Sequence, residues 1–485
     1  MTMTLVAVIG TVAALLGIGV RARFGAQVAV DEPQYLLTAL SIFDDFDLDI
    51  TDELDAGRWM PWAGTEALPV QTEVLADGTQ ISPHDPLLPI LLAVPMGLGG
   101  WVAAKVVMAL MAGALAALTL WTAVRRFAVP ARLATAGVIL ASATAPFAVY
   151  GQQVYPELPA ALTALAAVAV LTGPAFTAGT VSRTGRDVVV FGLLIMVLPW
   201  LSVKYAPVAA ALALLGLWRL RAARRPLLGL AAGLSVMGVV YLGVHRLVWG
   251  GWTVYASGDH FQGSGEFGVM GFNPNYAGRA VRLVGLMVDR GYGLAAWQPA
   301  WLLLLPAVGF ALWRLRSHGA VLLLPLAAGW LTATFVALTM HGYWWPGRQT
   351  VVVLPLALLL ILVLLARSPG LLRWAGLGLG VAGVVNYAWL LADGYARKVT
   401  WVSGFEQVGS PVYRVLGAVL PDYRLGWSGF WPLHLTWVFV SILLIFCGTP
   451  YLMKGNTHEA DPDPSGGDDA RPDRSADVRS DRLRR

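Results

Sequence analysis

Cysteine and lysine are both rare in this chain of 485 residues. The one cysteine, Cys447, stands in the last apolar stretch, so an intrachain disulfide and a CxxC metal site are both excluded. Only four lysines occur, and none of them precedes Ser or Thr. A Walker loop needs that pair of residues, so a phosphate-binding loop of this kind is excluded and an ATP-driven pump is not expected.

Charged residues are also few, at 13% of the chain against about 25% in soluble globular domains. Apolar residues make up 57%, and the mean hydropathy is +0.64. An apolar helix of about 20 residues spans a bilayer, so this composition predicts an all-α, multi-span membrane protein with about 12 transmembrane helices. The first apolar segment lacks a basic start and a small-residue cleavage site, which favours a retained span over a signal peptide.

The net charge of +5 does not indicate nucleic acid as a partner, because the arginines gather in short loops between apolar segments. The side on which these loops lie depends on the proline-rich apolar segment 84–98. If this segment does not cross the membrane, the arginine loops all lie in the cytoplasm, as the positive-inside rule prefers. We therefore predict an inner or plasma membrane protein with both termini in the cytoplasm.

This topology places twelve spans in one membrane-embedded domain, residues 1–453. The predicted spans are 4–20, 101–123, 131–150, 157–174, 187–202, 204–219, 227–249, 297–315, 319–340, 349–366, 371–391 and 431–453. The outward loops are 21–100, with short interfacial helices, and 151–156, 250–296, 341–348 and 392–430. The polar tail 454–485 has hardly an apolar residue to offset the entropy of folding, and we predict that it is disordered.

The first outward loop holds an acidic pair, Asp31 and Glu32, directly before Pro33. Acids followed by proline also suit the start of a helix, so helix capping and chemistry are both open interpretations. Apolar residues at helical spacing predict an interfacial helix over 33–43. The stretch 44–55 resembles the start of an EF-hand loop but lacks its glycine and its final glutamate, so we expect a solvated acidic loop.

Polar residues from distant segments meet on the outer face of this topology, each near the end of a span. They are Asp31, Glu32, His84, Asp85, Glu157, Lys204, Tyr205, His341, Tyr343 and Arg348. Each also has an ordinary explanation, since basic side chains snorkel to headgroups, aromatic residues anchor at interfaces, and an acid after proline caps a helix. Together they predict one extracytoplasmic site.

Four short motifs in these segments resemble the GT-C glycosyltransferases, which include protein O-mannosyltransferases and the aminoarabinose transferase of lipid A. The motifs are DEPQYL at 31–36, SPHDPLLP at 82–89, YPELP at 155–159 and GR at 347–348, within about residues 1–370. The resemblance implies a GT-C-like fold, a sugar donor on a polyprenyl phosphate, and a catalytic acid at Asp31. The chain departs from the family at Asp85, where proline is usual, and in lacking a sizeable outer domain after the last span.

Lipid-linked donors fit an outward-facing site, because nucleotide sugars are cytoplasmic. Asp31, with Glu32 beside it, is the candidate base for the acceptor hydroxyl, provided that an apolar surround raises its pKa. We expect direct attack with inversion, because no second carboxylate stands at a fixed spacing. The acceptor is an envelope glycan, lipid or protein.

The remaining candidate residues fall into three groups by expected role. Lys204, Arg348 and Tyr205 are predicted to hold the donor phosphate. His84, Asp85, His341 and Tyr343 are predicted to bind substrate. Asp31, Glu157 and Asp85 are the candidate ligands of a divalent ion such as Mg, Mn or Ca.

Two other functions fit the same sequence. A lipid or solute carrier or flippase also has about 12 spans and polar groups on one face, although its diagnostic charges lie at the membrane midplane. An oligosaccharide ligase or polymerase would use a lipid diphosphate as donor. Activity without a gradient, and the choice between monophosphate and diphosphate donors, separate these alternatives.

Overall fold

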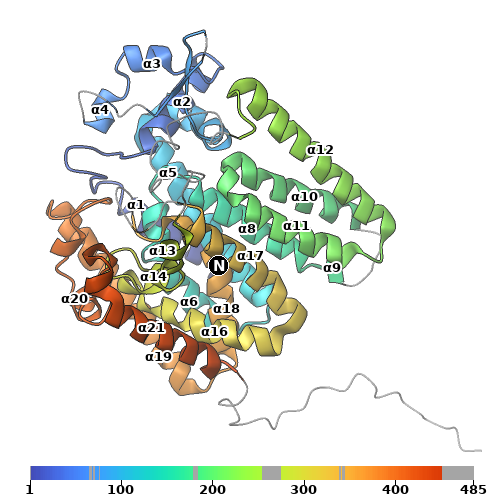
Figure 1. The fold of residues 1–485 in the computed structure, drawn as a ribbon, viewed down its shortest axis with the longest axis vertical. Coiled ribbons are helices and arrows are strands. Elements are labelled where there is room, and N and C mark those ends of the chain that lie inside the picture. The colour runs from blue at the N-terminus through green and yellow to red at the C-terminus, as the bar shows by residue number, and fades with distance from the viewer. Residues whose placement is uncertain are drawn as a thin grey trace, which may run out of the picture.

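The computed structural model describes residues 2–64, 68, 71–75, 77–177, 184–253, 275–337, 340 and 345–449. Over this part, the chain is a bundle of helices with a small β-hairpin at one end (Figure 1). The predicted disordered tail 454–485 lies outside the described residues.

The helices of the first half are α1 Thr2–Leu15, α2 Glu32–Asp44, α3 Thr51–Asp55, α4 Met60–Ala63, α5 Leu87–Arg126, α6 Ala131–Ser142, α7 Phe147–Tyr150, α8 Glu157–Leu171, α9 Pro174–Thr177, α10 Thr184–Leu201, α11 Ala206–Leu220 and α12 Arg224–Val248. Those of the second half are α13 Tyr276–Ala280, α14 Arg282–Val288, α15 Leu294–Trp297, α16 Leu304–Phe310, α17 Arg316–Phe335, α18 Leu354–Ala366, α19 Gly370–Tyr395, α20 Pro411–Gly417 and α21 Trp427–Cys447. Short 3-10 helices cover Val203–Tyr205, Pro299–Leu303, Arg348–Val353, Phe405–Gln407 and Tyr423–Leu425, and a π-helical turn covers Ala311–Leu315. The strands are β1 Glu73–Val74 and β2 Gln80–Ile81.

By length and composition, six stretches of the described part could cross a membrane as helices. They are Leu87–Arg126, Val203–Leu220, Arg224–Val248, Arg348–Ala366, Gly370–Tyr395 and Trp427–Cys447. Shorter apolar helices accompany them, and a helix lies at each of the twelve predicted span positions. The chain is a multi-pass membrane protein, while the count of twelve crossings stays a prediction.

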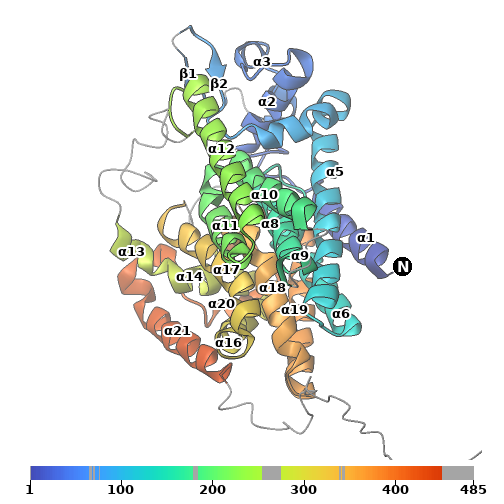
Figure 2. The same ribbon diagram turned by 90° about the vertical axis from the view of Figure 1, so that its right-hand side faces the viewer.

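The helices divide into a buried centre and an apolar rim. Helix α18 is apolar on every side and is buried from Leu354 to Leu365, as expected for a helix enclosed by others. Helix α12 lies along one edge of the bundle in Figure 1, and α21 lies along another edge in Figure 2. Both expose large apolar side chains, such as Val239 and Phe439, as expected for a surface in contact with lipid.

The segment 84–98, predicted to lie in the interface, forms the first part of α5. Gly100 breaks this helix with φ 65° and ψ −164°, a conformation open essentially to glycine only. Figure 2 shows the chain changing direction within α5. The break separates the proline-rich part from the predicted span 101–123, and α2 packs against α5.

The first outer loop is more structured than the sequence predicted. The expected interfacial helix 33–43 is α2, but its residues from Glu32 to Ser41 are buried inside the protein. The acidic stretch forms the short helix α3 and joins the β-hairpin, in which Glu73 pairs with Ile81 and Val74 with Gln80. An Asp49 carboxylate oxygen accepts hydrogen bonds from the backbone of Gln80 and Thr51, so this loop is only partly solvated.

Candidate functional site

Four charged side chains from distant segments form one hydrogen-bonded network. Arg348 donates from Nη2 to Asp31 Oδ2 at 2.6 Å and from Nε to Glu157 Oε1 at 2.8 Å. Lys204 Nζ donates to the same Glu157 oxygen at 2.6 Å. The structure thus brings together the four residues that the predicted topology assigned to one outer face. The two cations and two carboxylates balance in formal charge, so each buried charge of the network has an opposite partner.

Each member of the network is positioned by the backbone at the start of a helix. Arg348 begins a 3-10 helix that leads into α18, and Gly347 before it takes φ 81°, which favours glycine. Glu157 is the first residue of α8, and its carboxylate accepts hydrogen bonds from Lys204 and Arg348. Asp31 precedes α2 but makes no side-chain cap hydrogen bond. The capping interpretation is therefore wrong for the side chain of Asp31, which turns to Arg348 instead.

Asp31 is the carboxylate of this network that solvent reaches. Its side chain is 18% exposed, while that of Glu157 is fully buried. Burial alone would raise the pKa of the Asp31 carboxyl, but the Arg348 charge and the hydrogen bond and charge of His84 outweigh it and hold that pKa well below its usual value. The condition set for a base role, an apolar surround that raises the pKa of Asp31, is not met, because Asp31 faces a cation.

An aromatic ring packs against each of the two cations. The ring centroid of Tyr155 lies 4.0 Å from Arg348 Cζ, and that of Tyr205 lies 5.3 Å from Lys204 Nζ. Both tyrosines are buried in the protein. Such cation–π contacts favour the charged forms of lysine and arginine and limit their rotation. Tyr205 therefore holds Lys204 in place from within the protein.

His84 completes the exposed side of the network. Its Nε2 lies 3.8 Å from Asp31 Oδ2, and its Nδ1 lies 2.9 Å from Ser82 Oγ. The ring packs edge-on against Tyr35, with 4.5 Å between the ring centroids. His84 is thus close enough to Asp31 to influence its charge, in agreement with a place in the predicted site.

Glu32, predicted as catalytic beside Asp31, lies in a different environment. It is fully buried, where its two oxygens accept hydrogen bonds from the backbone of Ala29 and Val154 at 2.9 Å each. Lys105, also fully buried, lies 3.6 Å from Glu32 Oε1. Glu32 therefore ties the turn that carries Asp31 to the segment before α8. The geometry gives it a positioning role, and does not support a catalytic one.

This positioning role predicts a stability effect. Glu32→Gln should lower the free energy of unfolding by about 3–5 kcal/mol, because it leaves the Lys105 ammonium buried without a counter-charge. Thermal unfolding in detergent measures the change. The matched control, Glu406→Gln, alters an exposed side chain and should leave the melting temperature unchanged. A Glu32→Gln, Lys105→Met double variant should recover part of the loss, and a fully stable single variant would contradict the assignment.

Asp85, predicted as a substrate or metal ligand, is already occupied by donors from the protein. Tyr241 and His245 lie 2.9 Å from its Oδ1, and the backbone of Val203 donates to its Oδ2 at 2.9 Å. Its side chain is almost fully buried. Asp85 therefore fastens α12 to the turn that carries Lys204, and the prediction that it binds substrate or metal is not supported.

The predicted metal ligands do not fit a shared ion. Asp31 and Glu157 are paired with Arg348, and Asp85 has its own three donors. A divalent cation would have to displace those partners, so no step of the reaction is assigned to a metal here. His341 and Tyr343, predicted to bind substrate, lie outside the described residues.

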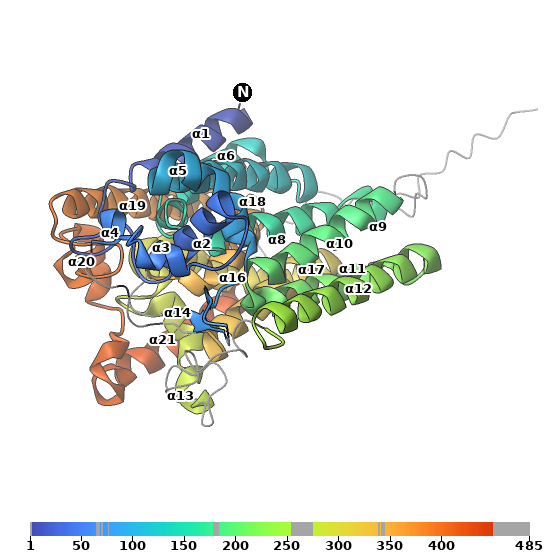
Figure 3. The same cartoon turned by 90° about the horizontal axis from the view of Figure 1, so that it is seen from above.

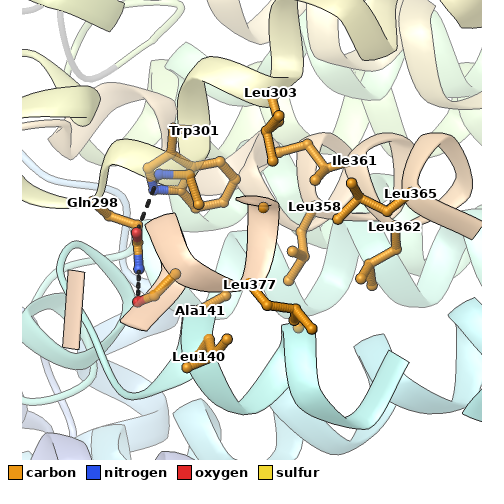
Figure 4. A pocket seen from close by; sticks show the side chains of 14 residues that line it. Leu140, Ala141, Gln298, Trp301, Leu303, Leu358, Ile361, Leu362, Leu365 and Leu377 are labelled. Atoms are coloured by element: carbon orange, nitrogen blue, oxygen red, sulfur yellow. Dashed lines mark hydrogen bonds between the residues drawn. The ribbon is translucent and has the colours of Figure 1, made fainter. Parts of the chain in front are cut away.

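Two cavities of the described part are candidates for a substrate site. A cavity of about 10 Å³ touches Lys204 and Tyr205, and it is too small for a sugar. Another cavity of about 40 Å³, shown in Figure 4, is lined mainly by apolar side chains and has no charged residue. Its polar side chain, Gln298, donates to Thr144 Oγ1 at 3.1 Å. Neither of these two cavities accounts for a sugar site.

Two supporting residues were not recognised in the sequence. Lys105 lies within the predicted span 101–123, and the structure buries it and pairs it with Glu32. A lysine within an apolar helix requires a partner, and this rule is the signal that could have identified it. His245 lies near the end of the predicted span 227–249, and its contact with Asp85 joins residues 160 positions apart.

No family model matches the chain, and no curated protein matches it. Two solved structures do: crystal structures of ArnT from Cupriavidus metallidurans, one bound to undecaprenyl phosphate and one in the apo state. Their sequence identities to this chain are 16% and 19%, with TM-scores of 0.48 and 0.49. Each match covers 92% of this chain and 74% of the other.

Proposed function

We propose that the chain is a membrane glycosyltransferase of the GT-C type that transfers a sugar from a polyprenyl phosphate to an envelope acceptor with inversion. The observation that carries this proposal is Arg348, which bonds to Asp31 and Glu157 at once with Lys204 alongside. Two fixed cations beside a partly exposed carboxylate supply what the reaction needs. The cations stabilise a departing phosphate, and the carboxylate accepts the acceptor proton.

The proposed reaction is a single displacement. The acceptor hydroxyl oxygen attacks the anomeric carbon of the sugar, while the bond from that carbon to the phosphate oxygen breaks. The electron pair of the broken bond stays on the phosphate, and the hydroxyl proton passes to Asp31. Lys204 and Arg348 hold the charge that develops on the polyprenyl phosphate. A phosphate leaves as a weak base, so the reaction needs no strong general acid.

Donor binding also explains how a carboxylate of low pKa can serve as the base. Arg348 stabilises the ionised form of Asp31 and so weakens it as a base. A donor phosphate competes with Asp31 for the guanidinium. When Arg348 donates a hydrogen bond to the phosphate in place of Asp31, the pKa of Asp31 rises. The carboxylate is then a better base in the presence of the substrate.

Donor cleavage by the purified protein tests this function. The protein in lipid nanodiscs, given envelope material as acceptor and no gradient, should transfer the sugar of polyprenyl monophosphate sugars to an acceptor hydroxyl, or more slowly to water. It should release polyprenyl phosphate, and the sugar product should have the inverted anomeric configuration. Matching polyprenyl diphosphate sugars should be poor donors. An intact donor that merely changes leaflet in vesicles would favour a carrier. Preference for the diphosphate would favour an oligosaccharide ligase or polymerase.

A further inference from the structure

Helices α2 and α3 meet in a group of carboxylates that the proposed reaction does not use. Asp45 ends α2, and Asp52 and Glu53 lie in the first turn of α3. Figure 1 shows the two helices at one end of the molecule, and in Figure 3 they again lie next to each other. One ligand oxygen from each of these three residues lies within 4.8 Å of the others.

Neighbouring carboxylates of the same loop have partners within the protein. Asp44 pairs with Arg58 at 3.1 Å, and an Asp47 oxygen accepts a hydrogen bond from Ser41 Oγ at 2.7 Å. Asp49, as described above, holds the β-hairpin. These contacts explain three of the acidic residues structurally. They leave Asp45, Asp52 and Glu53 as the group that needs another explanation.

Glu53 gives the independent evidence for a ligand. Its side chain is buried, with 1% of the residue exposed, yet neither carboxylate oxygen has a hydrogen-bond donor in the described part of the chain. A buried carboxylate without donors is costly, and such groups are usually paired or coordinate a metal. One oxygen of Glu53 lies in the group with Asp45 and Asp52, so a cation placed there would meet the carboxylate that lacks a donor.

Helix electrostatics do not explain the group by themselves. Asp52 and Glu53 suit the positive N-terminal end of α3. Asp45 stands at the C-terminal end of α2, where a negative charge is unfavourable, and it faces the other two acids. A bound cation would offset all three repulsions at once.

We propose that Asp45, Asp52 and Glu53 bind a Ca²⁺ ion. The ligands are all oxygens, which hard divalent cations prefer, and Ca²⁺–oxygen bonds of about 2.3–2.6 Å allow ligands on opposite sides to lie about 4.8 Å apart. Mg²⁺ requires shorter bonds of about 2.1 Å and a stricter octahedron. Water completes the coordination, because Asp45 and Asp52 are exposed. The site departs from an EF-hand, since its ligands come from two helices rather than from the regular loop positions.

The ion would fasten the end of α2 to the start of α3. Asp31 precedes the opposite end of α2, so the ion stabilises the element that carries the candidate base without touching the reacting atoms. Its binding is measured without any sugar donor. The metal site and the proposed transfer reaction can therefore fail independently of each other.

Calcium titration of the full-length protein tests the site. After removal of metals with EGTA, calorimetry should show one saturable Ca²⁺ binding event with Kd of about 0.1–1 mM, as in extracellular modules, and weaker Mg²⁺ binding. Saturating Ca²⁺ should raise the melting temperature. Absence of saturable Ca²⁺ binding, or equal affinity for Mg²⁺, would overturn the proposal.

Variants identify the ligands. Asp52→Asn and Asp45→Asn change exposed side chains that folding tolerates, and each should weaken Ca²⁺ binding at least tenfold. Glu53→Gln should abolish the Ca²⁺-dependent rise in melting temperature. The matched control, Asp55→Asn, removes an exposed charge from the same helix outside the group and should bind Ca²⁺ like the wild type. If the ligand variants keep wild-type affinity, the ion binds elsewhere and the assignment is wrong.

Discussion

Asp31→Asn should reduce sugar transfer by about 100- to 10,000-fold, the range that loss of a general base produces. Asparagine keeps the size of the side chain but cannot accept the proton of the acceptor hydroxyl. It also leaves Arg348 bonded to Glu157, so the network retains its other contacts. We therefore expect a folded protein that still binds the donor. The rate of transfer at saturating donor measures the loss of catalysis, and a separate binding assay measures the affinity for the donor.

The control for Asp31 is Asp422→Asn. Asp422 also pairs with an arginine, Arg424, at 2.8 Å, but this pair lies on the surface near the C-terminal helix. The Asp422→Asn variant should leave the rate of transfer unchanged, because exposed ion pairs contribute little to protein stability. Near-normal transfer by Asp31→Asn would reject Asp31 as the base, while loss of donor binding in that variant would assign it to substrate positioning.

The sequence could predict which segments meet, because topology alone brings the outer ends of helices to one face. Glu157, Lys204 and Arg348 were each assigned to that face from the spacing of apolar segments. The predicted locations required no knowledge of side-chain direction. To place them, it was enough to know where each helix ends and on which side of the membrane that end lies. The length of the apolar stretches indicates the first, and the distribution of arginines indicates the second.

The sequence could not predict which way the side chains of adjacent polar residues point. Asp31 and Glu32 stand side by side, and so do His84 and Asp85, yet one of each pair joins the network and the other is buried against different partners. These residues lie at or just before the start of a helix, where neighbouring side chains face different surroundings. Which one faces the site depends on contacts with distant residues such as Lys105, and these contacts exist only in the folded chain.

The charge of Asp31 shows the same limit. A base role for Asp31 was predicted on the condition that an apolar surround raises its pKa, but Arg348, which lies 317 positions away in the sequence, bonds to it. The charge of Arg348, together with His84, outweighs the effect of burial and lowers the pKa of Asp31. Sequence distance carries no information about such a pair.

Arg348→Ala should lower the rate of transfer by about 100- to 1,000-fold, as expected when a hydrogen-bonding group that stabilises developing negative charge is removed. The loss should appear in kcat/KM for the polyprenyl phosphate donor, because the guanidinium is proposed to hold its phosphate. Arg348→Lys should recover only part of the activity. A lysine restores the charge but cannot direct two fixed N–H groups to Asp31 and Glu157 at once. The matched control, Arg424→Ala, removes an exposed arginine and should transfer normally.

Combining the two site variants tests whether Arg348 and Asp31 act as a unit. If donor binding releases Asp31 by drawing Arg348 to the phosphate, each single variant already breaks the coupling. The Asp31→Asn, Arg348→Ala double variant should then be little worse than the more impaired single variant, because effects within one catalytic unit are not additive. If the two residues act independently, the fold-loss of the double variant should equal the product of the two single losses. That result, in folded proteins, would contradict the proposed release of the base. Near-normal transfer by Arg348→Ala would contradict the phosphate-binding role itself.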